Sequence, residues 1–100
     1  MAAADPTLTL RLRITGRVQG VGYRAWAEQT AQKLGLRGWV RNLTDGSVEA
    51  LAQGPEKDVK TFAAACQSGP TFARVAYVQS LPAEAFAGSG FAQAPTADRS

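Results

Sequence analysis

A glycine-rich segment that ends in an arginine is the part of this sequence best suited to chemistry. Residues 16–22 contain three glycines, and Tyr23 and Arg24 follow them. Glycines adopt the positive φ angles that turn successive backbone N–H groups toward one point, and the helix expected after them adds the positive end of its dipole. Arg24 can donate to the same oxygens with its planar, two-pronged guanidinium group. The segment therefore predicts a binding site for an anion such as a phosphate group.

Two commoner kinds of glycine-rich phosphate loop do not fit these residues. A Walker loop ends in Gly-Lys-Ser/Thr, whereas Tyr23 and Arg24 follow Gly22 here. A dinucleotide-binding fingerprint needs an acidic residue at a strand end about 20 residues further on, and Asn42 stands near that place. Less specific interpretations stay open at this point: the glycines can form a plain turn, Arg24 can belong to a helix surface, and Asn42 can be a turn former beside residues 44–46.

The composition excludes several kinds of catalytic site. With no histidine in 100 residues, neither a Ser-His-Asp triad nor histidine acid–base chemistry is available. The single cysteine, Cys66, cannot form an internal disulfide, and its place on the apolar face of an expected helix predicts a buried, inert thiol. Because the motif segments hold no Cys/His cluster and no pair of carboxylates, we expect neither a bound metal nor a cofactor.

Length and charge indicate one cytoplasmic domain that binds anions. One hundred residues, 45% of them apolar and 19% charged, suit a single globular domain that folds alone. The net charge is +3, and residues 6–27 contain four arginines but no acidic residue. No apolar run is long enough to span a membrane, and the first ten residues lack the pattern of a signal peptide. We therefore expect a cytoplasmic monomer without a membrane partner.

Alternating and helical patterns predict the elements that would position the glycine-rich segment. Residues 8–15 place leucine or isoleucine at every second position, as in a half-buried strand. Helical spacing of apolar residues follows from Tyr23 to just before Gly35, and a second helix is expected between Pro55 and Gly69. The other expected strands cover residues 36–43, 47–53 and 74–81, with a tight turn at 44–46 and a candidate fifth strand near Phe91.

The order of these elements, β-α-β-β-α-β, predicts a ferredoxin-like α+β sandwich in which both helices cover one face of an antiparallel sheet. Residues 7–95 would form this domain, and residues 1–6 and 96–100 would be disordered tails. The first β-α-β unit is expected to be a right-handed crossover, so its two strands run parallel and end at the same edge of the sheet. The glycine-rich loop, Arg24 and Asn42 should therefore converge there.

At these motifs the sequence resembles the acylphosphatase family. The resemblance covers residues 8–95 and rests on the runs at 16–24, 38–42 and 45–49. It implies a small α/β sandwich enzyme that hydrolyses the carboxyl–phosphate bond of acyl phosphates and releases a carboxylate and inorganic phosphate. It also implies that Arg24 binds the phosphate and that Asn42 positions the attacking water. The last strand departs from the family pattern, since residues 90–96 lack the charged residues expected there.

The physical chemistry of an acyl phosphate agrees with this implication. Its leaving group is a carboxylate that needs little protonation, so positioning and electrostatic stabilisation can suffice. Charge on the equatorial phosphoryl oxygens would be met by the Arg24 guanidinium and by backbone N–H groups, in place of a metal. The expected N–H donors are those of Gln19, Gly20, Val21, Gly22 and Tyr23. Asn42 can orient a water but cannot deprotonate it, so the base would be an oxygen of the substrate phosphate.

Two other functions are compatible with the expected fold. An RNA-binding module of the same topology stacks bases on aromatic residues of its central strands. The expected central strands, residues 8–15 and 47–53, contain no aromatic residue, so we expect no nucleic-acid partner. An inactive phosphate sensor would keep the loop without turnover, and the sequence leaves that alternative open. The expected partners are thus a small acyl phosphate as substrate and inorganic phosphate as product.

Overall fold

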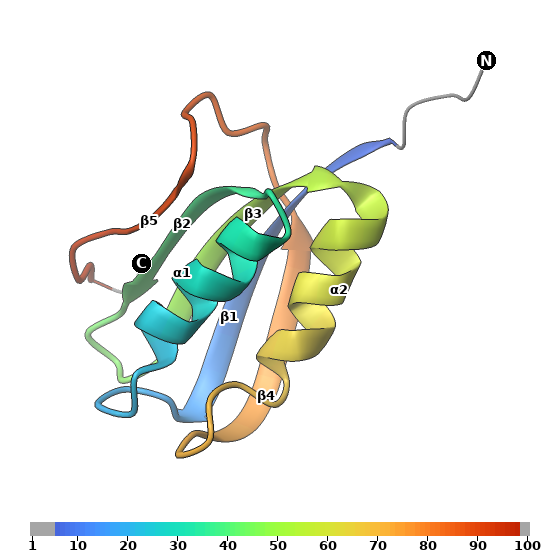
Figure 1. The fold of residues 1–100 in the computed structure, drawn as a ribbon. Helices are drawn as coiled ribbons and strands as arrows, with labels where there is room; N and C mark the ends of the chain where they lie inside the picture. The colour runs from blue at the N-terminus through green and yellow to red at the C-terminus, as the bar shows by residue number, and fades with distance from the viewer. Residues whose placement is uncertain (1–5, 99–100) are drawn as a thin grey trace.

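The computed structural model describes residues 6–98 of the chain (Figure 1). Its elements follow the order β-α-β-β-α-β, with a short further strand at the end. They are β1 (Thr7–Arg17), α1 (Tyr23–Lys33), β2 (Arg37–Asn42), β3 (Val48–Pro55), α2 (Glu56–Cys66), β4 (Arg74–Pro82) and β5 (Phe91–Gln93). None of the helices in this part of the chain is long and apolar enough to cross a membrane. The ferredoxin-like topology predicted from the sequence is confirmed.

The strands form one mixed sheet in the order β4-β1-β3-β2-β5. Neighbouring strands are antiparallel except β2 and β5, which run parallel and pair Gly38 with Phe91 and Val40 with Gln93. The sheet therefore differs at one edge from the wholly antiparallel sheet expected from the sequence. The reason is the connection over residues 83–90, which leads from β4 at one edge of the sheet to β5 at the other (Figure 1).

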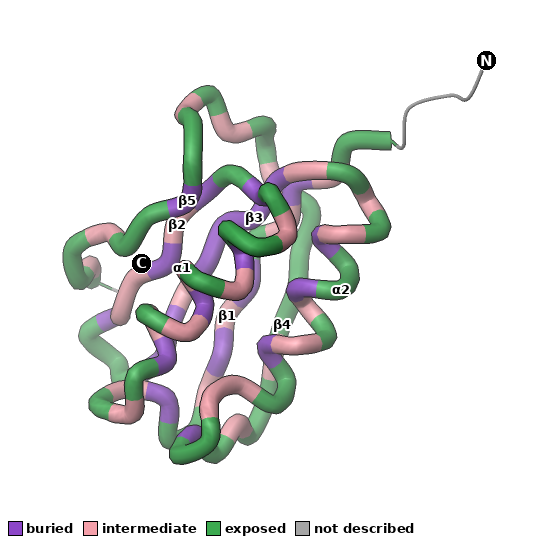
Figure 2. The backbone as a smooth tube through the Cα atoms, viewed as in Figure 1, coloured by how far each residue is buried: buried purple, intermediate pink, exposed green. Residues whose placement is uncertain are grey.

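Both helices cover the same face of the sheet, as predicted (Figure 1). Helix α1 packs on β2 and β5, and α2 packs on β1 and β3. The alternation along β1 decides which side chains enter the core, because Leu12 and Ile14 are fully buried while Arg11 and Arg13 point to the open face. Buried residues gather where the helices face the sheet (Figure 2). The largest of them are Tyr23, Phe62, Leu12, Ile14, Val18, Val40, Val48, Val59 and Cys66.

Glycine and proline end the elements close to the places that the sequence indicates. Gly22 caps the start of α1 with a φ of 80°, and Gly35 follows its end with a φ of 70°. Helix α2 begins directly after Pro55, which lacks the N–H that would have no partner there. Strands β2 and β3 are joined by the expected tight turn, in which the Leu43 N–H donates to the Ser47 carbonyl at 2.9 Å.

The chain beyond β5 runs beside the end of β2. The Ala97 N–H donates to the Asn42 carbonyl at 3.1 Å, and the Thr44 N–H donates to the Ala97 carbonyl at 3.0 Å. Ala97 belongs to residues 96–100, which we expected to form a disordered tail. Of the two expected tails, the structure describes residue 6 and residues 96–98. Residues 1–5 and 99–100 lie outside the described residues. The last described residues thus contact the strand that carries Asn42.

Candidate active site

The loop after β1, the start of α1 and the end of β2 meet at one end of the sheet (Figure 1). They surround a cavity of about 150 Å³. Its lining residues are Val18, Gln19, Gly20, Gly22, Tyr23, Arg24, Ala25, Asn42 and Gln93. The structure therefore brings together nearly all of the site residues expected from the sequence. Val21 is the exception, since its side chain is partly buried against the hydrophobic core.

The loop has the conformation that an anion cradle requires. Gly20 and Gly22 have φ angles of 73° and 80°, which side-chain-bearing residues rarely adopt. A Cβ atom at either glycine would meet nothing within 4 Å, so the backbone angle rather than lack of space calls for glycine. Within residues 6–98, the backbone N–H groups of residues 19–22 donate no hydrogen bond. These donors are available to a ligand, and the first turn of α1 has no acidic residue to compete for the ligand's place.

Arg24 is the second residue of α1 and lines the cavity. Its side chain is half-buried, and within the described part of the chain it forms no ion pair or hydrogen bond. All of its N–H donors are therefore available for an anion in the cavity. Its place at the positive end of the helix dipole increases the attraction for negative charge.

Asn42 is the last residue of β2 and also lines the cavity, although it lies far from the loop in the sequence. Its Oδ1 atom is buried and has no hydrogen-bond partner among the described residues. A buried acceptor without a partner costs about 1–3 kcal/mol, so such atoms are rare unless they face a ligand or a water. The Asn42 amide is thus in place to accept a hydrogen bond from a molecule bound in the cavity.

The Gln19 side chain holds the loop in place. Its Nε2 atom donates to the carbonyls of Leu43 and Ser47, both at 2.8 Å. These carbonyls belong to the turn between β2 and β3, so one amide fastens the loop to the end of the strand that carries Asn42. The sequence predicted only a backbone contribution from Gln19. The fastening role of its side chain was missed because it depends on contacts 24 and 28 residues away.

The Tyr23 side chain is buried in the hydrophobic core. Its hydroxyl donates to the Cys66 carbonyl at 2.7 Å. Burial, with a smaller contribution from Cys66, raises the pKa of Tyr23 far above its ordinary value, and burial raises the pKa of the Cys66 thiol to about 12. The Tyr23 side chain therefore anchors the start of α1 and stays neutral, although Tyr23 is also one of the residues that line the cavity. Cys66 is buried, as the sequence predicts.

Gln93 lines the cavity and was not expected there. It lies at the end of β5, whose form the sequence left open. Its Nε2 atom donates to Oε1 of Glu28 on α1 at 3.0 Å. A strand of three residues is too short to show an alternating pattern in the sequence. The position of Gln93 at the site is therefore seen only in the tertiary structure.

Comparisons with known proteins identify the family of this chain. The model of the family described as acylphosphatase matches residues 10–92. The chain belongs to the acylphosphatase family. The acylphosphatase of Rhodospirillum rubrum is 51% identical over 88 residues, which cover 88% of this chain and 97% of the relative. That of Azoarcus sp. is 52% identical over 97 residues, which cover 96% and 99% of the two chains. The crystal structure of the Bacillus subtilis acylphosphatase matches with a TM-score of 0.83 and 38% identity, covering 87% of this chain and 98% of that one.

Membership of the acylphosphatase family confirms the resemblance found in the sequence. Matches at this level over nearly the whole of both chains show a hydrolase of the same family and the same fold. Within residues 6–98, no group of three or more potential metal ligands lies together. The residues that line the cavity include glycines of the loop, one arginine and three amide side chains.

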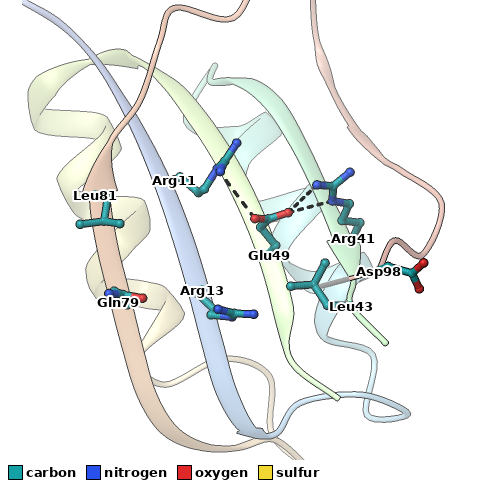
Figure 3. Close-up of a pocket in the computed structure, with 8 residues that line it drawn as sticks. All are labelled: Arg11, Arg13, Arg41, Leu43, Glu49, Gln79, Leu81 and Asp98. Atoms are coloured by element: carbon teal, nitrogen blue, oxygen red, sulfur yellow. Dashed lines mark hydrogen bonds and ion pairs between the residues drawn. The ribbon is translucent and has the colours of Figure 1, made fainter. Parts of the chain in front are cut away.

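A larger hollow of about 260 Å³ lies on the open face of the sheet, away from the glycine-rich loop at residues 16–22 (Figure 3). Arg11, Arg13 and Arg41 line it, but each is paired with a carboxylate. Glu49 lies 2.7 Å from Arg41 and 3.8 Å from Arg11, and Asp45 lies 3.1 Å from Arg13. None of the site residues expected from the sequence lines this hollow. Each of its three arginines is thus in an ion pair, whereas Arg24 forms none with the described residues.

Proposed function

We propose that this acylphosphatase binds the phosphoryl group of an acyl phosphate in the loop and directs a water at phosphorus through Asn42. The backbone N–H groups of residues 19–23 and the Arg24 guanidinium would hold the phosphoryl oxygens. The observation that carries the proposal is the buried Asn42 Oδ1, which has no partner in residues 6–98 and lines the same cavity as Arg24. One cavity thus offers donors for an anion and an acceptor for a water.

The donors suit the charge that develops during phosphoryl transfer. In a loose transition state, negative charge spreads over the three equatorial oxygens, and preorganised donors stabilise it without moving. The loop N–H groups are fixed by the positive φ angles of Gly20 and Gly22 and by the hydrogen bonds of Gln19. Arg24 adds a formal positive charge at the same place. These groups take the part that a metal ion has in many other phosphoryl-transfer enzymes.

In this mechanism the protein orients the attacking water and supplies no side chain as a general base. Asn42 accepts a hydrogen bond from the water through Oδ1, which aims the water's lone pair at phosphorus. The new bond forms between the water oxygen and phosphorus, and the bond from phosphorus to the acyl oxygen breaks. The acyl group leaves as a carboxylate, and the water's proton passes to a phosphoryl oxygen because an amide cannot take it. The products are the carboxylate and inorganic phosphate.

Phosphate release from benzoyl phosphate tests the proposal directly. We expect the protein to release phosphate well above the spontaneous rate and to be inhibited competitively by inorganic phosphate. Calorimetric titration with inorganic phosphate would be run on the same sample. Phosphate binding without turnover would identify a phosphate sensor and contradict the catalytic proposal.

The open face of the sheet does not favour a nucleic-acid-binding function. The interior strands β1 and β3 present Arg11, Arg13 and Glu49 there, with no aromatic ring on which a base could stack. On β2 the ring of Trp39 is covered by Arg41, whose Cζ lies 4.4 Å from the ring centroid. Base stacking on Trp39 would have to displace that contact.

A further inference from the structure

We propose that Gln93 is a positioning residue that keeps Arg24 available to phosphate by holding the carboxylate of Glu28. The inference rests on the proposed role of Arg24 as the phosphate-binding arginine. It concerns three residues from two elements: Arg24 and Glu28 on α1, and Gln93 on β5. Gln93 would act through Glu28 and would not need to touch the substrate.

Glu28 is a natural competitor for Arg24. The two residues are four positions apart on α1, so they lie one turn apart on the same side of the helix. Oppositely charged residues at this spacing are close enough to form an ion pair. Such a pair would place a carboxylate on the guanidinium that is meant to bind phosphate, and it would repel the anionic substrate. A family member that uses Arg24 for binding must therefore keep Glu28 elsewhere.

In the structure the Glu28 carboxylate contacts Gln93 and not Arg24. Among the described residues no ion pair joins Arg24 to Glu28. Glu28 Oε1 instead accepts a hydrogen bond from Gln93 Nε2 at 3.0 Å. Gln93 borders the same cavity as Arg24. This hydrogen bond thus holds one oxygen of the Glu28 carboxylate toward Gln93.

Strand β5 is well placed to supply this amide. Gln93 pairs with Val40 of β2, and the Ala94 N–H donates to the Val40 carbonyl at 2.8 Å. On the helix side, Gln32 Nε2 donates to the Phe91 carbonyl at 3.0 Å, which joins α1 to the start of β5. Gln93 is therefore carried on a segment fastened to both β2 and α1. Its reach to Glu28 does not depend on a free loop.

Replacing Gln93 and Glu28 singly and together tests this inference. In Gln93→Ala the carboxylate is released toward Arg24, and we expect the affinity for inorganic phosphate in calorimetry to fall by about two- to fivefold. In the double variant Gln93→Ala/Glu28→Gln the competing charge is gone, so affinity should return to that of the starting protein. Glu28→Gln alone should bind phosphate at least as tightly as the starting protein.

Gln79→Ala is the matched control, because Gln79 lies on β4 and lines the hollow on the open face. It should leave phosphate affinity unchanged, and thermal unfolding should show that every variant is folded. The inference is wrong if Gln93→Ala binds phosphate normally, or if the double variant stays as weak as Gln93→Ala, because Gln93 would then contact the ligand itself. Arg24→Ala separates the two proposals: if it binds phosphate as well as the starting protein, the proposed function fails and this inference fails with it.

Discussion

Asn42 and Arg24 line one cavity, yet their replacement should damage the enzyme in different ways. Asn42→Ala removes the acceptor proposed to orient the water but leaves the loop donors and Arg24 in place. We expect turnover of benzoyl phosphate to fall about a hundredfold or more, because a misplaced nucleophile loses most of the benefit of proximity. Phosphate affinity should change little. Unchanged turnover together with lost phosphate affinity would contradict the roles assigned here.

Arg24→Ala should lower both binding and turnover. A charged, two-pronged contact contributes about 1.5–3 kcal/mol in the ground state, so phosphate affinity should fall by roughly tenfold or more in calorimetry. Arg24→Lys should remain severely impaired, because an ammonium group cannot align two oxygens as the planar guanidinium does.

Arg17 is the matched control for Arg24. It is exposed at the end of β1, where it pairs with Arg74 of β4, and it does not line the cavity. Arg17→Ala should therefore lose much less phosphate affinity and turnover than Arg24→Ala. Equal losses at Arg17 and Arg24, or a fully active Arg24→Lys enzyme, would mean that general positive potential attracts the substrate.

At the scale of elements, the loop depends on one glutamine. Gln19→Ala removes both hydrogen bonds that tie the loop to the turn between β2 and β3. We expect the free energy of unfolding in urea to fall by about 1–3 kcal/mol and phosphate affinity to fall as well, since the N–H donors would no longer be held toward one point. A loss of stability with unchanged phosphate affinity would show that the loop keeps its shape without Gln19.

Local patterns predicted most elements of the fold, and tertiary contacts decided the rest. Alternation indicated residues 8–15 as a strand, but β1 continues to Arg17 because an irregularity between Thr15 and Gly16 lets its pairing with β4 go on. The parallel β5 could not be predicted, because its place depends on the connection over residues 83–90. That connection is fixed by hydrogen bonds between Gln53 and Phe86, 33 residues apart.

The same distinction holds for the candidate site. Arg24, Asn42 and the loop glycines could be chosen from the sequence, because a strand–loop–helix unit and the parallel direction of two strands bring them to one edge. The side-chain contacts of Gln19 and Gln93 reach 24 to 65 residues along the chain. Neither residue differs in type or spacing from an ordinary surface glutamine.

For the whole molecule, two buried ionisable groups predict how stability depends on pH. Burial raises the pKa of Cys66 from 9.0 to about 12, and that of Tyr23 rises well above its ordinary value of 10.0. Above about pH 9 the unfolded chain loses protons that the folded chain keeps, so the stabilising effect is complete below that pH. The free energy of unfolding should fall as pH rises from 9 toward 12, by up to about 1.4 kcal/mol per pH unit for each group.

Urea unfolding between pH 8 and 11 measures this dependence, and Cys66→Ala is the informative variant. Its stability should be lower at neutral pH because a small cavity forms in the core. The decline between pH 9 and 10 should become clearly shallower, because Tyr23 ionises in the unfolded chain only near its ordinary pKa of 10.0. An unchanged slope in Cys66→Ala would mean that the thiol is not the group responsible.

The direction of β1 has a practical consequence for anyone who attaches this enzyme to a surface or a fusion partner. From Thr7 to Arg17 the strand covers about 35 Å, and the cavity lies beyond its far end. Ala97, in contrast, is hydrogen-bonded to Asn42 and Thr44, beside the cavity. A linker joined ahead of β1 keeps its load a full strand's length from the cavity, whereas one joined after Ala97 pulls on the neighbours of Asn42.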